Sequence, residues 1–144
     1  MIAWKRANPA GDLLTALINA EDDGDVLDDD ELIAQTLLLY IAGHETTVNL
    51  IAGGTLALLR HPDQLALLRE NPGLTGNAVE ELLRYDSPVQ ATRRVTLEPV
   101  TFSGVTIPAG AFVMALLGSA NRDESYWGSD AAEVRLDREN ARQH

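Results

Sequence analysis

Cysteine is absent from the 144 residues of this sequence. Its absence excludes disulfide bonds, thiolate zinc sites, iron–sulfur clusters, a cysteine nucleophile and a thiolate ligand to haem iron from within this chain. Basic side chains are also few, with 11 Lys and Arg against 22 Asp and Glu and a formal net charge of −11. Affinity for nucleic acid comes largely from clustered Lys and Arg, so no nucleic-acid partner is expected.

Long apolar runs and targeting signals are lacking as well. The most hydrophobic stretch, residues 32–59, is interrupted by Gln35, His44 and Glu45. It therefore never reaches the run of about 18 apolar residues that a membrane span needs. No apolar segment follows the early basic residues, as a signal peptide would require. We expect no membrane partner and a cytoplasmic protein.

What is present fits an ordinary globular protein. The apolar fraction is 45%, and the length is typical of one domain. The order of elements predicts an α+β fold, mainly α, over residues 1–144. Residues 1–88 are expected to be helical, residues 89–120 to form a small antiparallel sheet, and residues 121–144 to be an irregular, charged segment.

The longest predicted helix runs from Leu32 to Leu59 and is apolar around most of its circumference, which is typical of an interior helix. Asp28 and Glu31 form a capping box before it, and the helix is expected to end near Arg60. Shorter helices are predicted at residues 12–20, 62–68 and 77–85, the last of them ended by Ser87-Pro88.

An acidic stretch precedes the longest helix, with eight carboxylates in the eleven positions from Glu21 to Glu31. One interpretation is a calcium loop that starts at Asn19 and turns at Gly24. Glu21 and Asp30 do not suit their positions in such a loop, so a solvated acidic loop is favoured.

After Pro88 the hydrophobic period changes to that of strands. Short β-like runs occur at residues 95, 100–102, 105–107 and 112–114. Ser103-Gly104 and Pro108-Ala109-Gly110 supply turns between them.

Residues 42–47, Ala-Gly-His-Glu-Thr-Thr, break the pattern in the middle of the longest helix. A glycine, a carboxylate and two β-branched hydroxyls stand where Leu or Ala would be better helix formers. Gly43 would let another group approach the backbone, and Glu45 beside Thr46 could relay a proton. A zincin site is excluded because the position four after the histidine is Val48. The alternative is a polar stripe that faces solvent.

Two further segments carry charged side chains at informative spacings. Glu81 and Arg84, or Glu80 and Arg84, can meet on one face of the helix at residues 77–85. Arg94 precedes the predicted sheet, where a guanidinium could hold an anionic group of a ligand. Taken singly, an exposed ion pair and a surface arginine are the commoner explanations.

Together, the order and spacing of these segments resemble the C-terminal half of a bacterial-type cytochrome P-450, a haem-thiolate monooxygenase. Residues 42–47 match the oxygen-activating motif of the family's I helix, and residues 81–84, Glu-Leu-Leu-Arg, match the Glu-x-x-Arg motif of its K helix. Arg94 matches the arginine that usually grips a haem propionate. Arg138 matches the arginine that completes a cluster with the Glu-x-x-Arg pair. The resemblance covers essentially the whole chain.

The resemblance implies a partial cytochrome P-450 fold and an enzyme that inserts one oxygen atom of O₂ into a small organic substrate. The cofactor would be haem. Electrons would come from NAD(P)H through separate partners of the ferredoxin and ferredoxin reductase type.

The resemblance also implies roles for individual residues. Thr46 would hydrogen-bond the bound dioxygen, and Glu45 would relay protons to it. The other implied roles are haem contacts at Ala42, Gly43 and Arg94, substrate-pocket contacts at Val89 and Ala91, and a structural cluster of Glu81, Arg84 and Arg138.

The sequence departs from the family pattern near its end. In the family, residues 140–144 would lead into the Phe-Gly-x-Gly-x-His-x-Cys loop that supplies the haem thiolate. That loop is not in the sequence, so we expect no metal ligand from this chain, a fragment of the enzyme, and no activity from these residues alone. Val134 and Arg135 stand where the family favours Phe and Asp. The alternative reading is a non-catalytic helical remnant that serves as an interaction module.

Overall fold

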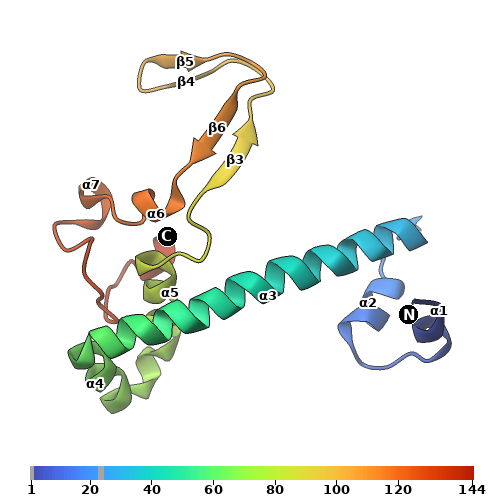
Figure 1. Cartoon of the computed structure of the whole chain (residues 1–144), viewed down its shortest axis with the longest axis horizontal. Helices are drawn as coiled ribbons and strands as arrows, with labels where there is room; N and C mark the ends of the chain where they lie inside the picture. The colour runs from blue at the N-terminus through green and yellow to red at the C-terminus, as the bar shows by residue number, and fades with distance from the viewer. Residues whose placement is uncertain (1, 23–24) are drawn as a thin grey trace. The chain divides into compact units, whose positions relative to one another are not determined.

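The structure of the protein is a computed structural model that describes residues 2–22 and 25–144. The chain divides into two compact units, one that ends at Glu45 and one that begins at Thr46. The longest helix, α3 (Asp29–Arg60), contributes residues to both units (Figure 1). The described residues are mainly helical with a small amount of antiparallel β-structure, which confirms the predicted fold class.

Two helices of the N-terminal unit begin at an aspartate cap. The elements of this unit are α1 (Ile2–Ala7), α2 (Leu13–Ile18), the antiparallel pair β1 (Glu21–Asp22) and β2 (Asp25–Val26), and the start of α3. At α2, the Asp12 carboxylate accepts a hydrogen bond from the Thr15 backbone N–H at 3.0 Å. At α3, the Asp28 N–H donates to Glu31 Oε2 at 3.0 Å, and the Glu31 N–H donates to Asp28 Oδ1 at 2.8 Å. The predicted capping box is confirmed, and it sets where α3 begins.

The acidic segment before α3 includes positions 23 and 24, so Gly24 of the calcium-loop interpretation lies outside the described residues. Within the described ranges, no group of three or more His, Cys, Asp or Glu side chains is placed to hold a metal ion. Part of the acidic charge is neutralised inside the unit, because Arg6 pairs with Asp29 at 2.7 Å.

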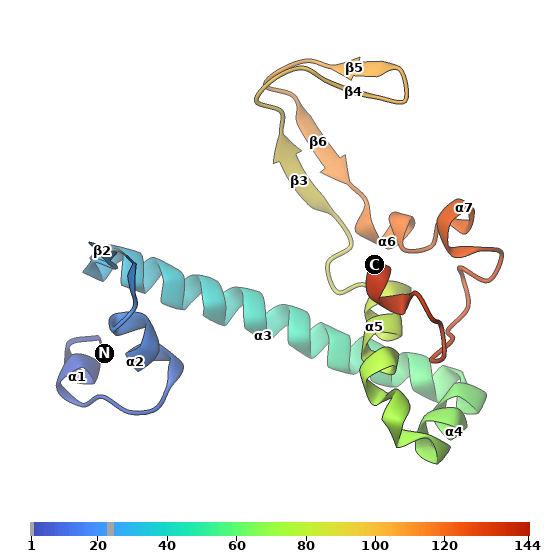
Figure 2. The same cartoon turned by 180° about the vertical axis from the view of Figure 1, so that it is seen from behind.

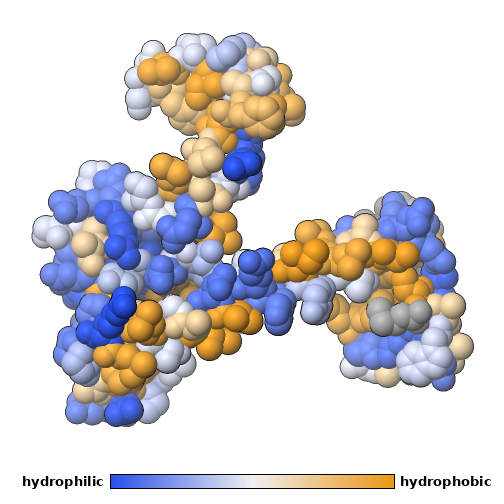
Figure 3. Space-filling model, in the orientation of Figure 1, coloured by the Kyte–Doolittle hydropathy of each residue, from blue (hydrophilic) through white to orange (hydrophobic). Residues whose placement is uncertain are grey.

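Helix α3 is 32 residues long and ends at Arg60, as the sequence predicts. Leu32 near its start is buried, but much of the helix carries apolar side chains that are open to solvent in this chain. The exposed ones include Leu37, Leu38, Leu39, Tyr40, Ile41, Val48 and Ile51. Figure 3 shows this apolar surface in orange along the helix. No helix in the part of the chain that the structure describes is long and apolar enough to cross a membrane.

Two short helices of the C-terminal unit, η1 and η2, contact α5. After α3, its helical elements are α4 (Pro62–Glu70), η1 (Pro72–Leu74), α5 (Thr75–Tyr85), α6 (Leu117–Ala120), α7 (Glu124–Trp127) and η2 (Ala141–Gln143). The helices predicted at residues 62–68 and 77–85 are confirmed with ends shifted by at most two residues. Figures 1 and 2 both show the C-terminal residues beside α5, which η2 contacts.

Between α5 and α6, the chain forms two nested antiparallel strand pairs. The pairs are β3 (Thr92–Val95) with β6 (Phe112–Ala115), and β4 (Val100–Phe102) with β5 (Val105–Ile107). The predicted small sheet is thus present as separate two-stranded pieces. Ser103 and Gly104 join β4 to β5 with φ of 47° and 80°, the positive values that a type I′ hairpin turn requires.

The core of the C-terminal unit joins α5 to the segment that follows α7. Ala78 of α5 packs with Val134 and Leu136, and the partly buried residues against this cluster are Leu58, Leu67, Leu68 and Tyr85. Residues 121–144 are largely irregular, yet Val134 is only 4% exposed and Leu136 is fully buried. Val134 therefore packs in the core although the family favours a larger side chain there.

Two adjacent glycines of α3 lie close to the side chains of Leu82 and Asp86. A Cβ on Gly54 would lie 3.1 Å from Leu82 Cδ1, and a Cβ on Gly53 would lie 2.8 Å from Asp86 Oδ2. By contrast, a Cβ on Gly43 of the same helix would meet nothing within 4 Å. Gly54 is buried and Gly43 is exposed, so only the former is required by packing.

We predict that Gly54→Val lowers the free energy of unfolding by about 1–3 kcal/mol more than Gly43→Val. Both changes place the same β-branched residue in the same helix, so their difference measures the packing cost against Leu82. Chemical denaturation of the two variants followed by circular dichroism gives this difference. Equal losses in the two variants would contradict the packing argument.

Candidate functional site

The Glu81–Arg84 pair on α5 lies inside the protein. The Arg84 Nε donates to Glu81 Oε2 and its Nη2 donates to Glu81 Oε1, both at 2.8 Å. Neither side chain has exposed surface. The three-residue spacing places both groups on one helical face, and the amphipathic pattern of α5 turns that face inward. The pair is therefore a buried, bidentate ion pair, not an exposed one.

Arg138 is the third member of this buried charge cluster. Its Nε lies 3.2 and 3.1 Å from the two carboxylate oxygens of Glu81, and the residue is 4% exposed. The backbone N–H of Arg135 also donates to Glu81 Oε1, at 2.9 Å. The carboxylate thus accepts bonds from groups more than fifty positions away in the chain. The structure brings together Glu81, Arg84 and Arg138, as the resemblance implies.

Most of the remaining guanidinium N–H groups donate to backbone carbonyls of the irregular segment. Arg84 Nη1 donates to the carbonyls of Asn121 at 2.6 Å and Ala131 at 2.7 Å, and its Nη2 donates to the carbonyl of Glu133 at 2.8 Å. Arg138 Nη2 donates to the carbonyl of a neighbouring residue, Asp130, at 2.9 Å. Full pairing of this kind is what makes burial of charge tolerable.

Asp130 lies at the edge of the cluster. Its Oδ2 accepts from Arg135 Nη1 at 2.7 Å, and its Oδ1 accepts from Arg138 Nη1 at 3.1 Å. The hydrogen bonds from Arg135 first and Arg138 second lower the pKa of this carboxyl to about 2. Asp130 therefore stays ionised well into the acid range.

Residues 42–47 lie on α3 without a break in the helix. Ala42, Gly43 and Glu45 belong to the N-terminal unit and are exposed, while Thr46 belongs to the C-terminal unit and is partly buried. Open space surrounds the Gly43 position, as noted above. The ring of His44 stacks on an aromatic neighbour of the same helix, Tyr40, with centroids 5.7 Å apart and planes inclined by 2°.

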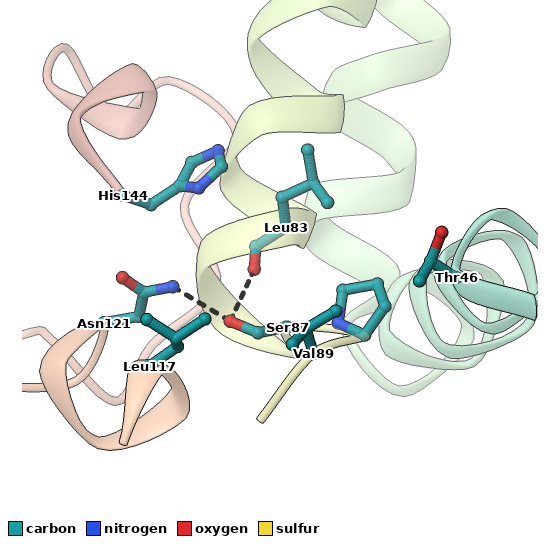
Figure 4. A pocket seen from close by; sticks show the side chains of 8 residues that line it. Thr46, Leu83, Ser87, Val89, Leu117, Asn121 and His144 are labelled. Atoms are coloured by element: carbon teal, nitrogen blue, oxygen red, sulfur yellow. Dashed lines mark hydrogen bonds between the residues drawn. The ribbon is translucent and has the colours of Figure 1, made fainter. Parts of the chain in front are cut away.

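A cavity of about 340 Å³ in the C-terminal unit contains two of the predicted site residues, Thr46 and Val89. Its other lining residues are Leu83, Ser87, Pro88, Leu117, Asn121 and His144. Figure 4 shows Thr46 on one side of this cavity, with Asn121 and His144 on the other and the Ser87–Val89 turn between them. The walls are mostly apolar, with a few hydroxyl, amide and imidazole groups, which is the usual make-up of a small-molecule site.

The sequence pattern does not indicate Ser87, Asn121 or His144 as lining residues. It predicts only that Ser87 follows a helix end and that Asn121 begins an irregular, charged segment. Asn121 Nδ2 donates to Ser87 Oγ at 2.9 Å across 34 positions of sequence. His144 Nε2 lies 3.0 Å from Glu80 Oε2. No local pattern could have signalled these contacts.

Ala91 and Arg94 do not line this cavity. Arg94 stands on β3 opposite Val113 and is exposed, and its Nη1 donates to Thr92 Oγ1 at 2.7 Å and to the Arg93 carbonyl at 2.8 Å. A larger concavity of about 410 Å³ on the β3–β6 pair is lined by Arg93, Phe112, Val113 and Met114. It holds none of the predicted site residues, so the smaller cavity at Thr46 is the better candidate site.

We predict that Glu81→Gln destabilises the C-terminal unit by about 3–5 kcal/mol, because it leaves the buried Arg84 guanidinium without a counter-charge and Arg138 with Asp130 as its remaining carboxylate partner. Glu80→Gln is the matched control, since the Glu80 carboxylate pairs with His144 at a partly exposed position, so the same change there should cost less than about 1 kcal/mol. Denaturant titration of both variants makes the comparison. A small loss for Glu81→Gln would refute the assignment of a structural charge cluster.

A second prediction concerns acid stability. The pKa of Asp130 is lowered in the fold from 3.8 to about 2, so its ionised form stabilises the fold above pH 4. That contribution should disappear as the pH falls from about 4 to about 2. The difference in denaturation midpoint between the parent chain and Asp130→Asn should be constant above pH 5 and shrink below pH 4. A difference that stays constant down to pH 2 would argue against these ion pairs.

The Cytochrome P450 family profile matches residues 4–73 and 69–142 of the chain. The chain is 59% identical over 128 residues to the "Vitamin D(3) 25-hydroxylase" of Pseudonocardia autotrophica, covering 88% of this chain and 32% of the relative. It is 50% identical over 125 residues to the "Biotin biosynthesis cytochrome P450" of Bacillus subtilis, covering 87% and 31%. The chain thus spans about a third of the length of the curated relatives it matches.

Solved structures with similar sequences have the same fold. The cytochrome CYP109E1 from Bacillus megaterium in complex with testosterone matches with a TM-score of 0.91 and 38% identity, covering 96% of this chain and 38% of that one. P450BioI in complex with an acyl carrier protein matches with a TM-score of 0.87 and 46% identity, covering 96% and 35%. The family profile, the relatives and the fold agree, and the chain belongs to the cytochrome P450 family.

Proposed function

We propose that this chain is the part of a haem-dependent monooxygenase that forms the wall of the oxygen and substrate site. The observation that carries the proposal is the shared cavity of Thr46 and Val89. One oxygen atom of O₂ would enter a C–H bond of a small organic substrate, and the other would leave as water. Two electrons and two protons balance the reaction.

The residues of this chain match the chemical groups of a haem in their polarity, charge and size. The apolar side chains of Leu83, Val89 and Leu117 suit the faces of a porphyrin, and an exposed guanidinium on β3, that of Arg94, suits a propionate. Ala42 and Gly43 add little bulk to α3, and the space around Gly43 is open. When bound, the haem supplies the iron centre at which O₂ is activated.

The thiolate ligand of that iron would come from residues outside this sequence, since the 144 residues contain no cysteine. We therefore expect no monooxygenase activity from these residues by themselves. Glu81, Arg84 and Arg138 would contribute through the fold and not through contact with the cofactor.

Within the site, Thr46 and Glu45 would handle protons. The Thr46 hydroxyl, at the cavity wall, can both donate and accept a hydrogen bond, so it can hold a proton donor in place beside the reacting oxygen. The Glu45 carboxylate is exposed on α3 and can exchange protons with water. Val89 and Ala91 would contact the substrate.

The substrate would be small and largely apolar, because the cavity walls are mostly apolar. The relatives fit this class, since their names and titles mention vitamin D(3), testosterone and a hexadecenoic acid carried on an acyl carrier protein. NAD(P)H would supply electrons through ferredoxin reductase and ferredoxin-type proteins. We place the complete enzyme in the cytoplasm, with neither nucleic acid nor membrane among its partners.

The test uses a chimera in which this segment replaces the matching third of the Pseudonocardia relative. Thr46→Ala should lower the product formed per NAD(P)H consumed by about tenfold or more, because the hydroxyl that positions the proton is lost. Product from vitamin D(3) and NAD(P)H consumption are measured in the same reaction. Thr46→Ser keeps the hydroxyl and should retain most of the coupling.

Thr47→Ala is the matched control, since it removes a hydroxyl from the neighbouring exposed position. Full coupling in Thr46→Ala would show that Thr46 does not have this role. A loss of the same size in Thr47→Ala would point to a general effect on the helix instead.

A further inference from the structure

The turn that carries Val89 into the cavity is held at its first residue. Ser87 follows the end of α5 and is 9% exposed. Its hydroxyl donates to the carbonyl of Leu83 at 2.9 Å and accepts from Asn121 Nδ2 at 2.9 Å (Figure 4). A serine hydroxyl has one proton, and here it is donated to the Leu83 carbonyl. In its second hydrogen bond the Ser87 oxygen is therefore the acceptor, and the Asn121 amide is the donor.

Asn121 is itself fixed by the buried charge cluster. Its backbone carbonyl accepts from Arg84 Nη1 at 2.6 Å, while its side-chain amide reaches Ser87. One residue thus connects a fully buried guanidinium to the turn at the cavity. A hydrogen bond from a charged donor is stronger than one between neutral groups. The bond from Arg84 therefore fixes the Asn121 backbone, and with it the position of the Asn121 side chain.

A second set of hydrogen bonds fixes the turn at Gln90. The Gly118 N–H at the start of α6 donates to the Gln90 carbonyl at 3.1 Å, and Gln90 Nε2 donates to the Ser87 carbonyl at 2.7 Å. A Cβ on Gly118 would lie 2.3 Å from Gln90 Oε1, so a larger residue there would displace the Gln90 amide from this position. Val89 lies between these two attachment points.

We propose that Asn121 is a positioning residue that sets the location of Val89 in the cavity and thereby the affinity for substrate. The assignment rests on the proposed function, in which Val89 contacts the substrate. Asn121 lines the cavity as well, but its amide proton points to Ser87, so it acts through the turn. Loss of this bond frees the turn on the Ser87 side while the charge cluster stays intact.

The first arm of the test measures the turn directly in the 144-residue chain by hydrogen exchange. Asn121→Leu keeps the side-chain shape and removes the donor, and Ser87→Ala removes the acceptor. Each should accelerate exchange in the peptide that contains residues 86–91 by about 3- to 10-fold, with no change in the β4–β5 hairpin. The double variant should add little to either single change, because both remove the same bond.

The matched control is Asn71→Leu, in which a side-chain amide also loses one bond, to the carbonyl of Leu67 at 3.1 Å. Asn71 does not line the cavity, and exchange at residues 86–91 should remain unchanged. Unchanged exchange in Asn121→Leu and Ser87→Ala would overturn the proposal. Equal acceleration across the whole unit would overturn it too, since that result indicates general destabilisation.

The second arm measures substrate affinity by the haem absorption shift in the chimera described above, with vitamin D(3) as the probe. Asn121→Leu and Ser87→Ala should raise the dissociation constant by about 3- to 10-fold. Ser87→Thr keeps the hydroxyl and should bind within about twofold of the parent. Binding is read without turnover, so a defect in electron supply does not affect it.

Val89→Phe separates the two proposals. If Val89→Phe changes the dissociation constant and Asn121→Leu does not, the positioning role is wrong and the site assignment stands. If neither variant changes it, the cavity is not the substrate site, and the proposed function fails at that point. Changes in both, together with the faster exchange of residues 86–91, support the positioning role.

Discussion

A single buried carboxylate, that of Glu81, joins α5 to the irregular segment near the end of the C-terminal unit. It pairs with Arg84 on its own helix and with Arg138 from a distant part of the chain. The N–H groups of Arg84 that do not bind Glu81 donate to backbone carbonyls between residues 121 and 133. A charge buried at this depth is stable only when every partner is in place, so the cluster forces the irregular segment onto α5.

The candidate site depends on the same cluster. Arg84 fixes the backbone of Asn121, and the amide of Asn121 fixes Ser87, which begins the turn that carries Val89. One wall of the cavity, the turn of residues 87–89, is therefore positioned by contacts with the buried cluster. Support of this kind would let the turn hold a precise position in the candidate site although it lies outside a helix or strand.

Local interactions explain why much of the fold could be predicted from the sequence. The capping box of Asp28 and Glu31 and the hairpin turn at Ser103-Gly104 each involve residues within three positions of one another. The ends of α3 and α4 follow from proline and from the apolar period in the same way. The exposed apolar surface of α3 also follows from a helix that is hydrophobic around most of its circumference.

The sequence by itself determined the helices, the hairpin turn and the family motifs, because these depend on spacings of a few residues. Spacing also placed Glu81 and Arg84 on one helical face, but it could not say whether that face is buried. Only the tertiary structure decided that the pair lies in the core and that Asn121 reaches Ser87. It also places Arg138 against Glu81, which the family resemblance had implied and no local spacing could show. Such contacts join residues 34 to 57 positions apart, and their formation depends on the packing of the whole unit, which no local pattern encodes.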